Sequence, residues 1–171
     1  MDIKRVAMLA TLLVAGAFLT ACGNSPSLGR FDVELSVEGW PSDVPLAPIE
    51  VDVVAVSAEN LSKWESTAMG EYWRSAFRRD ANKRTFRFAA DDRGVKVLER
   101  SEDIWDAWAN GSRLLVLADL PDAEPGRTAG ESLAVLTLPR EQKRWGGRRT
   151  IEIGLLPSQL QLKTPPLPES E

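Results

Sequence analysis

The sequence has 171 residues, a formal net charge of −4 at pH 7 and a hydrophobic content of 43%. A chain of this length forms one domain, and its acidic balance gives no general electrostatic reason to bind nucleic acid. It contains no histidine, which excludes Ser-His-Asp and Cys-His nucleophile systems and every imidazole metal site. No glycine-rich phosphate-binding motif occurs either, so we expect no cofactor.

Residues 1–21 have the organisation of an export signal. Lys4 and Arg5 form a short basic head, and residues 6–19 carry no charge. This apolar run is too short to cross a hydrocarbon core of ~30 Å, which requires ~20 residues in a helix. A basic head, a short apolar core and small residues at the boundary are typical of a secretory signal peptide.

The apolar run ends in Leu19-Thr20-Ala21-Cys22, which contains the only cysteine of the chain. These four residues resemble the lipobox of bacterial lipoproteins, where the signal is cut before the cysteine and its sulfur receives a diacylglycerol. Stable anchoring needs two or more acyl chains, which this modification supplies. The resemblance implies lipidation of Cys22 and a lipid bilayer as its partner. The alternatives are a secreted protein with a chance cysteine and an uncleaved anchor.

The residues after the cysteine suggest where the protein resides. Gly23 follows Cys22, and in Gram-negative lipoproteins a residue other than aspartate permits transfer to the outer membrane. We therefore expect a protein of the cell envelope, anchored in the outer membrane and facing the periplasm. Residues 22–30 are polar and rich in turn formers, which predicts a tether before a domain at 31–163. Residues 164–171 are proline-rich and acidic, which predicts a disordered tail.

The first half of the domain contains two strand patterns and a helical pattern. Residues 31–38 alternate strictly between apolar and polar side chains, and residues 49–56 form a second strand pattern. Three prolines separate them at 39–48. Residues 57–77 change to helical spacing, with Ser57 as a possible cap. Gly70 weakens this segment, so we expect one weakened helix or two short helices meeting there.

The second half contains further strand patterns at 84–90, 94–99, 113–120, 132–138, 149–156 and 159–163. The runs at 113–120 and 132–138 are almost continuously apolar, which predicts strands covered on both faces. Turn signals at 91–94 and at Gly146-Gly147 favour chain reversals, the second as a hairpin, and residues 102–111 suggest one helical turn. The chain is predicted to be mainly β, an antiparallel β-sandwich of transthyretin or immunoglobulin type, with a helical insertion after the second strand.

Charged clusters offer weak candidates for chemistry. Asp119, Asp122 and Glu124 could hold Ca²⁺, but the loop lacks the glycine and terminal glutamate of an EF-hand, so a solvated loop is expected. No carboxylate pair is persuasive as an acid–base couple, although two facing carboxylates in a cleft would support an enzyme. Basic runs at 78–87 and 140–149 are interpreted as solvated faces, with an acidic partner or lipid phosphates as the alternative.

Six tryptophans are more than this length predicts. Trp64, Trp73 and Trp105 are expected to fill the core where helix meets sheet. Exposed tryptophans can also stack on sugars, so a ligand- or glycan-binding sandwich using Trp105, Trp108 or Trp145 is the main alternative function. Trp40 stands apart, because it lies in a Gly/Pro/Asp loop where a large aromatic suits a contact with a partner.

The order of these segments resembles the outer-membrane lipoproteins of type VI secretion systems, the TssJ family. Residues 31–56 resemble the family's first hairpin, 60–73 its helical insertion, and 113–120 and 149–162 its later strands. The long loop at 122–132 and the tryptophan content depart from the family. The resemblance implies a non-enzymatic docking protein whose loop between the first two strands engages the periplasmic part of a large inner-membrane component. The contact candidates are then Trp40, Asp43, Val44 and Leu46.

The lipobox generates the first prediction. Protein made in its native host should fractionate with membranes, because acyl chains on the Cys22 sulfur hold it at the bilayer. Fractionation followed by mass spectrometry of the N-terminal peptide measures both properties. Recovery as free soluble protein with an unacylated residue 22 would contradict the prediction.

Overall fold

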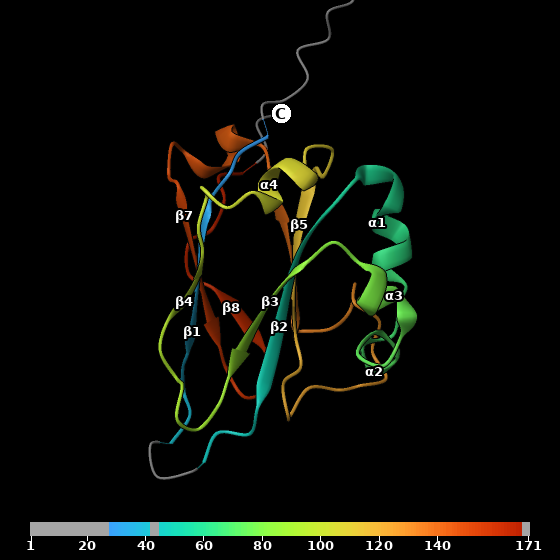
Figure 1. Cartoon of the computed structure of the whole chain (residues 1–171), viewed down its shortest axis with the longest axis vertical. Coiled ribbons are helices and arrows are strands. Elements are labelled where there is room, and N and C mark those ends of the chain that lie inside the picture. Colours follow the sequence, from blue (N-terminus) through green and yellow to red (C-terminus); the bar gives the residue numbers. More distant parts are fainter. Residues whose placement is uncertain (1–27, 42–44, 169–171) are drawn as a thin grey trace, which may run out of the picture.

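Two four-stranded sheets face each other in the computed structural model, which describes residues 28–41 and 45–168 (Figure 1). The first sheet has the order β4-β1-β7-β8, formed by Lys96–Leu98, Asp32–Val37, Thr150–Leu155 and Leu160–Leu162. The second has the order β3-β2-β5-β6, formed by Arg84–Phe88, Ile49–Val56, Arg113–Ala118 and Val135–Pro139. The predicted mainly β sandwich is confirmed. All neighbouring strands are antiparallel except β1 and β7, which pair in parallel.

The predicted hairpins at 31–56 and at Gly146-Gly147 are not formed, because the strands on either side of each connection belong to opposite sheets. By contrast, β5 and β6 pair within one sheet, and so do β7 and β8. β1 and β2 belong to different sheets, as do β3 and β4. Gly146 and Gly147 have φ values of 58° and 81°, but they end a short 3₁₀ helix, η1 (Gln142–Trp145), and carry the chain from β6 to β7 in the opposite sheet. Turn residues indicate that the chain reverses, and they do not determine which sheet receives the next strand.

The inner core lies between the sheets and contains side chains from both. It includes Val33, Leu35, Val51, Val53, Val116, Ile151 and Ile153, together with Phe31, Trp105 and Trp145. The predicted short helical turn is α4 (Ile104–Ala107), which brings Trp105 into this core. The alternation in β1 and β7 thus reflects burial of one face against the opposite sheet.

β5 is buried on both faces, as its continuous apolar sequence predicts. Leu114 and Val116 face the inner core, whereas Leu115 and Leu117 face a second, outer core. β6 differs from its prediction, since it is an edge strand that pairs with β5, and Thr137 within it is exposed. An apolar run therefore marks burial but does not separate a central strand from an edge strand.

The helical insertion consists of three short helices, α1 (Ala58–Glu65), α2 (Met69–Tyr72) and α3 (Ala76–Asp80). The loop at 122–132 causes the break before α2, because its carbonyls at Pro125 and Arg127 accept hydrogen bonds from the amides of Gly70 and Met69 at 2.9 Å each. A Cβ on Gly70 would lie 3.0 Å from the Pro125 carbonyl oxygen, so glycine permits this close approach. Ser57 precedes α1, but its side chain does not cap the helix.

These helices cover the outer face of the second sheet (Figure 1). Val54, Val56, Leu115 and Leu117 from β2 and β5 meet a set of residues from the insertion and the long loop. That set consists of Trp64, Met69, Tyr72 and Ala129. The helical layer is therefore held by its own hydrophobic cluster, which explains how β5 becomes buried on both sides.

A buried carboxylate fixes this helical layer to the sheet. Asp52 of β2 is completely buried and accepts hydrogen bonds from Tyr72 Oη at 2.9 Å and Thr85 Oγ1 at 2.6 Å. Arg78 of α3 donates from Nε to Asp52 at 2.7 Å and also pairs with Glu50. Burial, together with the adjacent carboxylate, raises the pKa of Tyr72, so its hydroxyl remains a donor. The network joins β2, β3, α2 and α3.

Hydrogen bonds at both ends of the described chain extend beyond residues 31–163. Gly29 donates to the Arg140 carbonyl at 2.7 Å, so residues 28–30 belong to the domain rather than to the tether. At the other end, Leu167 exchanges hydrogen bonds with Arg144, which attaches part of the predicted 164–171 tail. Cys22 and residues 1–21 lie outside the described residues. Within residues 28–41 and 45–168, no helix is long and apolar enough to cross a bilayer.

The guanidinium of Arg140 is buried where the chain enters the domain. It is 2% exposed and donates to the carbonyls of Gly29, Trp108 and Gly111, the last two at 2.6 and 2.7 Å. Its central carbon lies 5.2 Å from the Trp105 ring centroid. Burial lowers its pKa to about 10, which leaves it charged at neutral pH. Arg140 thus ties the entry segment to the core.

The Asp52 network generates the second prediction. Arg78→Ala should lower the free energy of unfolding by about 3 kcal/mol, because it leaves the buried Asp52 carboxylate without its cation. Arg79→Ala is the matched control, since the Arg79 side chain is exposed on the same helix. Urea denaturation of both variants measures the difference. Equal stabilities for the two variants would contradict the structural role of the ion pair.

Candidate functional site

The connection between β1 and β2, residues 38–48, is the candidate docking surface. Its described residues, 38–41 and 45–48, lie at the end of the sandwich opposite to the segment that precedes β1 (Figure 1). The last described residues lie at the same end as that entry segment. The molecule therefore has an entry end, where the chain enters and leaves, and a distal end formed by the β1–β2 connection.

Gly39 and Trp40 fix the start of this connection. Gly39 has a φ of 68°, a left-handed conformation that side-chain-bearing residues rarely adopt. The turn brings Trp40 against the inner core, where its Nε1 donates to the Leu155 carbonyl at 3.2 Å. Trp40 is partly buried, so part of the ring serves the fold and the remainder is accessible.

Leu46 fixes the other end of the connection. Its side chain is 3% exposed and belongs to the inner core. The expectation that Leu46 contacts a partner directly is therefore corrected: burial of this leucine closes the distal end of the sandwich. Asp43 and Val44 lie outside the described residues, so their predicted role stays a prediction. The structure thus brings Trp40 and Leu46 to the same core from either side of the connection.

The tryptophans proposed for glycan binding are core residues. Trp105, Trp108 and Trp145 are 1%, 3% and 1% exposed. Each indole donates to a backbone carbonyl, at 2.9, 2.8 and 2.9 Å respectively. Trp105 and Trp108 also pack edge to face against each other. Stacking on a sugar requires an open ring face, so the glycan-binding interpretation of these residues is wrong.

The other two tryptophans lie on the helical insertion. Trp64 is buried in the outer core, as predicted. Trp73 is only partly buried, and the central guanidinium carbon of Arg78 lies 4.4 Å from its ring centroid. Trp73 therefore combines packing against the outer core with a cation–π contact at its edge.

The acidic candidates are not gathered into a chemical site. Glu124 forms an ion pair with Arg127, and this hydrogen bond lowers the pKa of Glu124. Within the described part of the chain, no group of three or more acidic, cysteine or histidine residues could hold a metal ion. Glu50 and Asp52 are neighbouring carboxylates, but both pair with Arg78, which lowers the pKa of Glu50. They therefore act as ion-pair acceptors.

Sequence reasoning did not identify a groove between α2, α3 and β3. Its volume is about 560 Å³, and we call it the basic groove. The basic groove is lined by Glu50, Trp73, Arg74, Ser75, Arg78, Arg79, Lys83, Thr85 and Arg87. The basic run at 78–87 was its only signal in the sequence, and that run also contains Arg84, which pairs instead with Glu102.

Comparison with solved structures finds similarity to components of type VI secretion systems. Lip of Serratia marcescens, a membrane-bound component of that system, is 11% identical over 85% of this chain and 100% of that chain, with a TM-score of 0.49. The TssM C-terminal domain from EAEC is 14% identical over 81% of this chain and 98% of that chain, with a TM-score of 0.47. The lipoprotein TssJ1 of Pseudomonas aeruginosa is 15% identical over 83% of this chain and 100% of that chain, with a TM-score of 0.43.

The family that the sequence resembles is thus represented among the similar solved structures. No protein-family model and no curated protein matches the sequence.

Gly39 generates the third prediction. Gly39→Ala should lower the free energy of unfolding by about 1–2 kcal/mol, because alanine is strained at a positive φ. Its Cβ would also lie 3.1 Å from Leu156 Cδ2. Gly126→Ala is the matched control, since a Cβ there meets nothing within 4 Å. Urea denaturation of both variants measures the difference, and equal destabilisation would show that Gly39 has no special conformational role.

Proposed function

We propose that this chain is a lipid-anchored protein of the bacterial envelope that docks another protein. In this proposal the acylated Cys22 holds the domain at the outer membrane, with the sandwich in the periplasm. The β1–β2 connection engages the periplasmic part of a large inner-membrane component of a type VI secretion system. The role is structural and includes no catalytic step.

The opposed positions of the entry segment and the β1–β2 connection carry this proposal (Figure 1). Hydrogen bonds from Gly29 and Arg140 attach the chain to the entry end of the sandwich. The six residues from Cys22 to the first described residue span at most roughly 20 Å. A lipid on Cys22 would therefore hold the entry end close to the bilayer and leave the distal end facing away from it.

The order of segments supports the same function. A lipobox precedes a two-sheet sandwich, and a helical insertion follows the second strand. This combination is the basis of the resemblance to type VI secretion lipoproteins noted from the sequence. The Serratia protein is a membrane-bound component of such a system, and the Pseudomonas protein is one of its lipoproteins. This resemblance supports the proposed envelope location and the proposed class of partner.

The two ends of the β1–β2 connection are held by the core, which limits the proposed partner contact to the few residues between them. Trp40 and Leu46 are both packed against the inner core. Five residues lie between them in the sequence, and a segment that leaves and returns reaches at most half of its extended length, roughly 10 Å, beyond its fixed ends. In the proposal, Asp43 and Val44 contact the partner together with the accessible edge of Trp40. Leu46 supports the connection from within the core.

The fourth prediction concerns this contact. Val44→Ser and Asp43→Ala should each reduce recovery of the inner-membrane component by about tenfold, because central interface residues carry most of the binding energy. Leu167→Ser is the matched control, since Leu167 is 48% exposed and lies beside Arg144 at the entry end. Trp40→Ala should reduce recovery further and also destabilise the fold. Quantitative pull-down of the lipidated protein from native membranes measures all four variants.

Undiminished recovery with Val44→Ser, Asp43→Ala and Trp40→Ala would remove the β1–β2 connection from the proposal. Absence of the inner-membrane component from pull-downs of the unsubstituted protein would remove the secretion-system role. Anchoring is measured separately, through the acylation of Cys22.

A further inference from the structure

The basic groove concentrates positive charge on an acidic protein. Five cationic side chains and one carboxylate line it, whereas the whole chain has a formal net charge of −4. The cations come from separate places in the sequence: Arg74 follows α2, Arg79 belongs to α3, Lys83 precedes β3 and Arg87 lies in β3. The fold has therefore brought them together on one face.

Fixed interactions hold part of the groove in shape. Arg78 is bound by the buried Asp52 and by Glu50, and its guanidinium packs over Trp73. Lys83 Nζ donates to the Arg78 carbonyl at 2.7 Å. Arg78 forms the floor of the groove and is also part of the buried Asp52 network. The floor therefore cannot move without disturbing the contacts that hold the helical layer. Such rigidity lowers the entropic cost of binding.

Other cations retain donors that face solvent. Arg79 and Arg74 are exposed, and among the described residues Arg74 donates from its Nε alone, to the Gly70 carbonyl. Arg87 is 78% exposed in its side chain and uses its Nε toward Glu50. The terminal guanidinium nitrogens of Arg74 and Arg87 therefore remain as donors in the groove. Guanidinium groups bind carboxylates with two parallel hydrogen bonds.

The arrangement suits several anionic groups spread along a chain better than one concentrated anion. Glu50 lies within the groove between cations and would repel a phosphate dianion placed against it. The solvent-facing donors surround this carboxylate and come from separate elements, so they do not converge on one point. A peptide with successive carboxylates could reach them individually, and weak surface ion pairs become significant in such networks.

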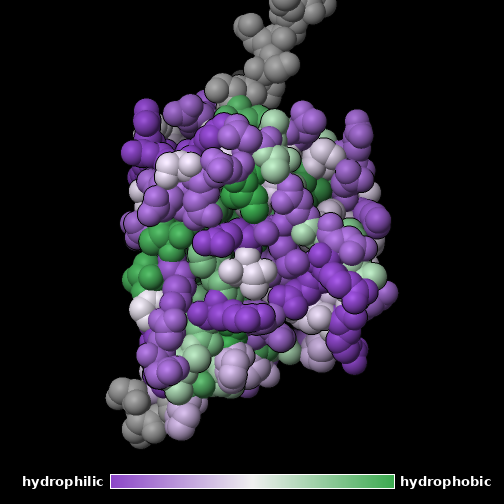
Figure 2. Space-filling model, in the orientation of Figure 1, coloured by the Kyte–Doolittle hydropathy of each residue, from purple (hydrophilic) through white to green (hydrophobic). Residues whose placement is uncertain are grey.

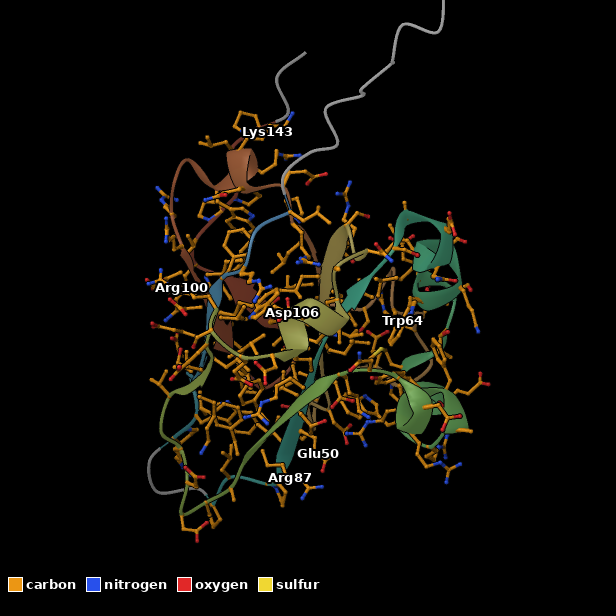
Figure 3. All side chains as sticks on the ribbon, turned by 45° about the horizontal axis from the view of Figure 1, so that its top comes forward. Glu50, Trp64, Arg87, Arg100, Asp106 and Lys143 are labelled. Atoms are coloured by element: carbon orange, nitrogen blue, oxygen red, sulfur yellow. The ribbon has the colours of Figure 1, made fainter. Side chains whose placement is uncertain are left out.

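The groove also lies away from the entry end. Figure 3 draws the labelled Glu50 and Arg87 close together, far from Lys143 and Asp106. Hydrophilic side chains cover the front face where Figure 1 draws β3 beside α2 and α3 (Figure 2). A protein segment can approach this face without the bilayer taking part.

We propose that the basic groove binds an acidic segment of a protein partner, rich in Asp and Glu, through Arg74, Arg79 and Arg87. This surface is separate from the β1–β2 connection, because neither Trp40 nor Leu46 lines it. The inference goes beyond the proposed function and does not depend on which envelope complex the protein joins.

The fifth prediction tests this groove with a fluorescein-labelled deca-glutamate peptide and the full lipidated protein in a non-ionic detergent. Fluorescence anisotropy measures the dissociation constant. The double variant Arg74→Gln/Arg79→Gln should weaken binding about tenfold, because two charge-assisted pairs are lost. Binding should also weaken as salt rises, since the groove is open to solvent.

The control variant is Arg148→Gln/Arg149→Gln, which removes the same charge from a second basic surface near Glu152 and Lys163. It should change the dissociation constant by less than about twofold if the groove is specific. Equal weakening by both double variants would overturn the proposal, as would absence of peptide binding at about 1 mM. Urea denaturation of both variants verifies that they remain folded.

Two further probes distinguish the class of ligand. Inorganic phosphate and phosphatidylglycerol vesicles are added as competitors of the labelled peptide. Weak competition by both supports a carboxylate-bearing segment. Stronger binding of phosphate or vesicles than of the peptide, lost in Arg74→Gln/Arg79→Gln, would overturn the protein-segment assignment in favour of a phosphate site.

Discussion

The buried carboxylate of Asp52 is the constraint on which the arrangement of this fold depends. A charge removed from water costs several kcal/mol unless a cation and hydrogen-bond donors surround it. Arg78, Tyr72 and Thr85 supply them from α3, α2 and β3. These three elements must therefore meet over β2. The Asp52 network thus joins the helical layer to β2 and β3 beside the hydrophobic contacts of the outer core, and its Arg78 also forms the floor of the basic groove.

A second constraint gives the molecule its two distinct ends. Arg140 is held by carbonyls from the entry segment, α4 and its following turn, so the beginning of the domain is bound to the core. At the distal end, Trp40 and Leu46 anchor the β1–β2 connection through apolar contacts. A pull on the chain at the entry end is thus transmitted to the folded domain, while the distal end stays available for a partner. Such an arrangement, with the attached end and the contact end on opposite sides, suits the proposed lipid-anchored docking protein.

The tryptophans show that residue type alone does not predict function, because a ring able to stack on a sugar can instead be buried in the core. Trp105, Trp108 and Trp145 suggested a sugar-binding surface because exposed tryptophan rings can stack on sugars, yet each is buried with its indole nitrogen bonded to a backbone carbonyl. The single cysteine allows no internal disulfide, so the domain depends on burial. Large aromatic side chains contribute much of that burial in a small sandwich.

Local periodicity is enough to predict most of the elements, as the alternation at 31–38, the apolar run at 113–120 and the helical spacing after Ser57 illustrate. The segment at 19–22 that resembles a lipobox is likewise visible without the fold, because its residues are contiguous in the sequence. The folded arrangement was needed to show that β1 and β2 lie in different sheets, that β6 is an edge strand and that Leu46 is buried. It alone gathered Arg74, Arg79 and Arg87 into one groove. Periodicity records which face of a segment is buried, whereas sheet membership and clustering depend on contacts between residues far apart in the chain.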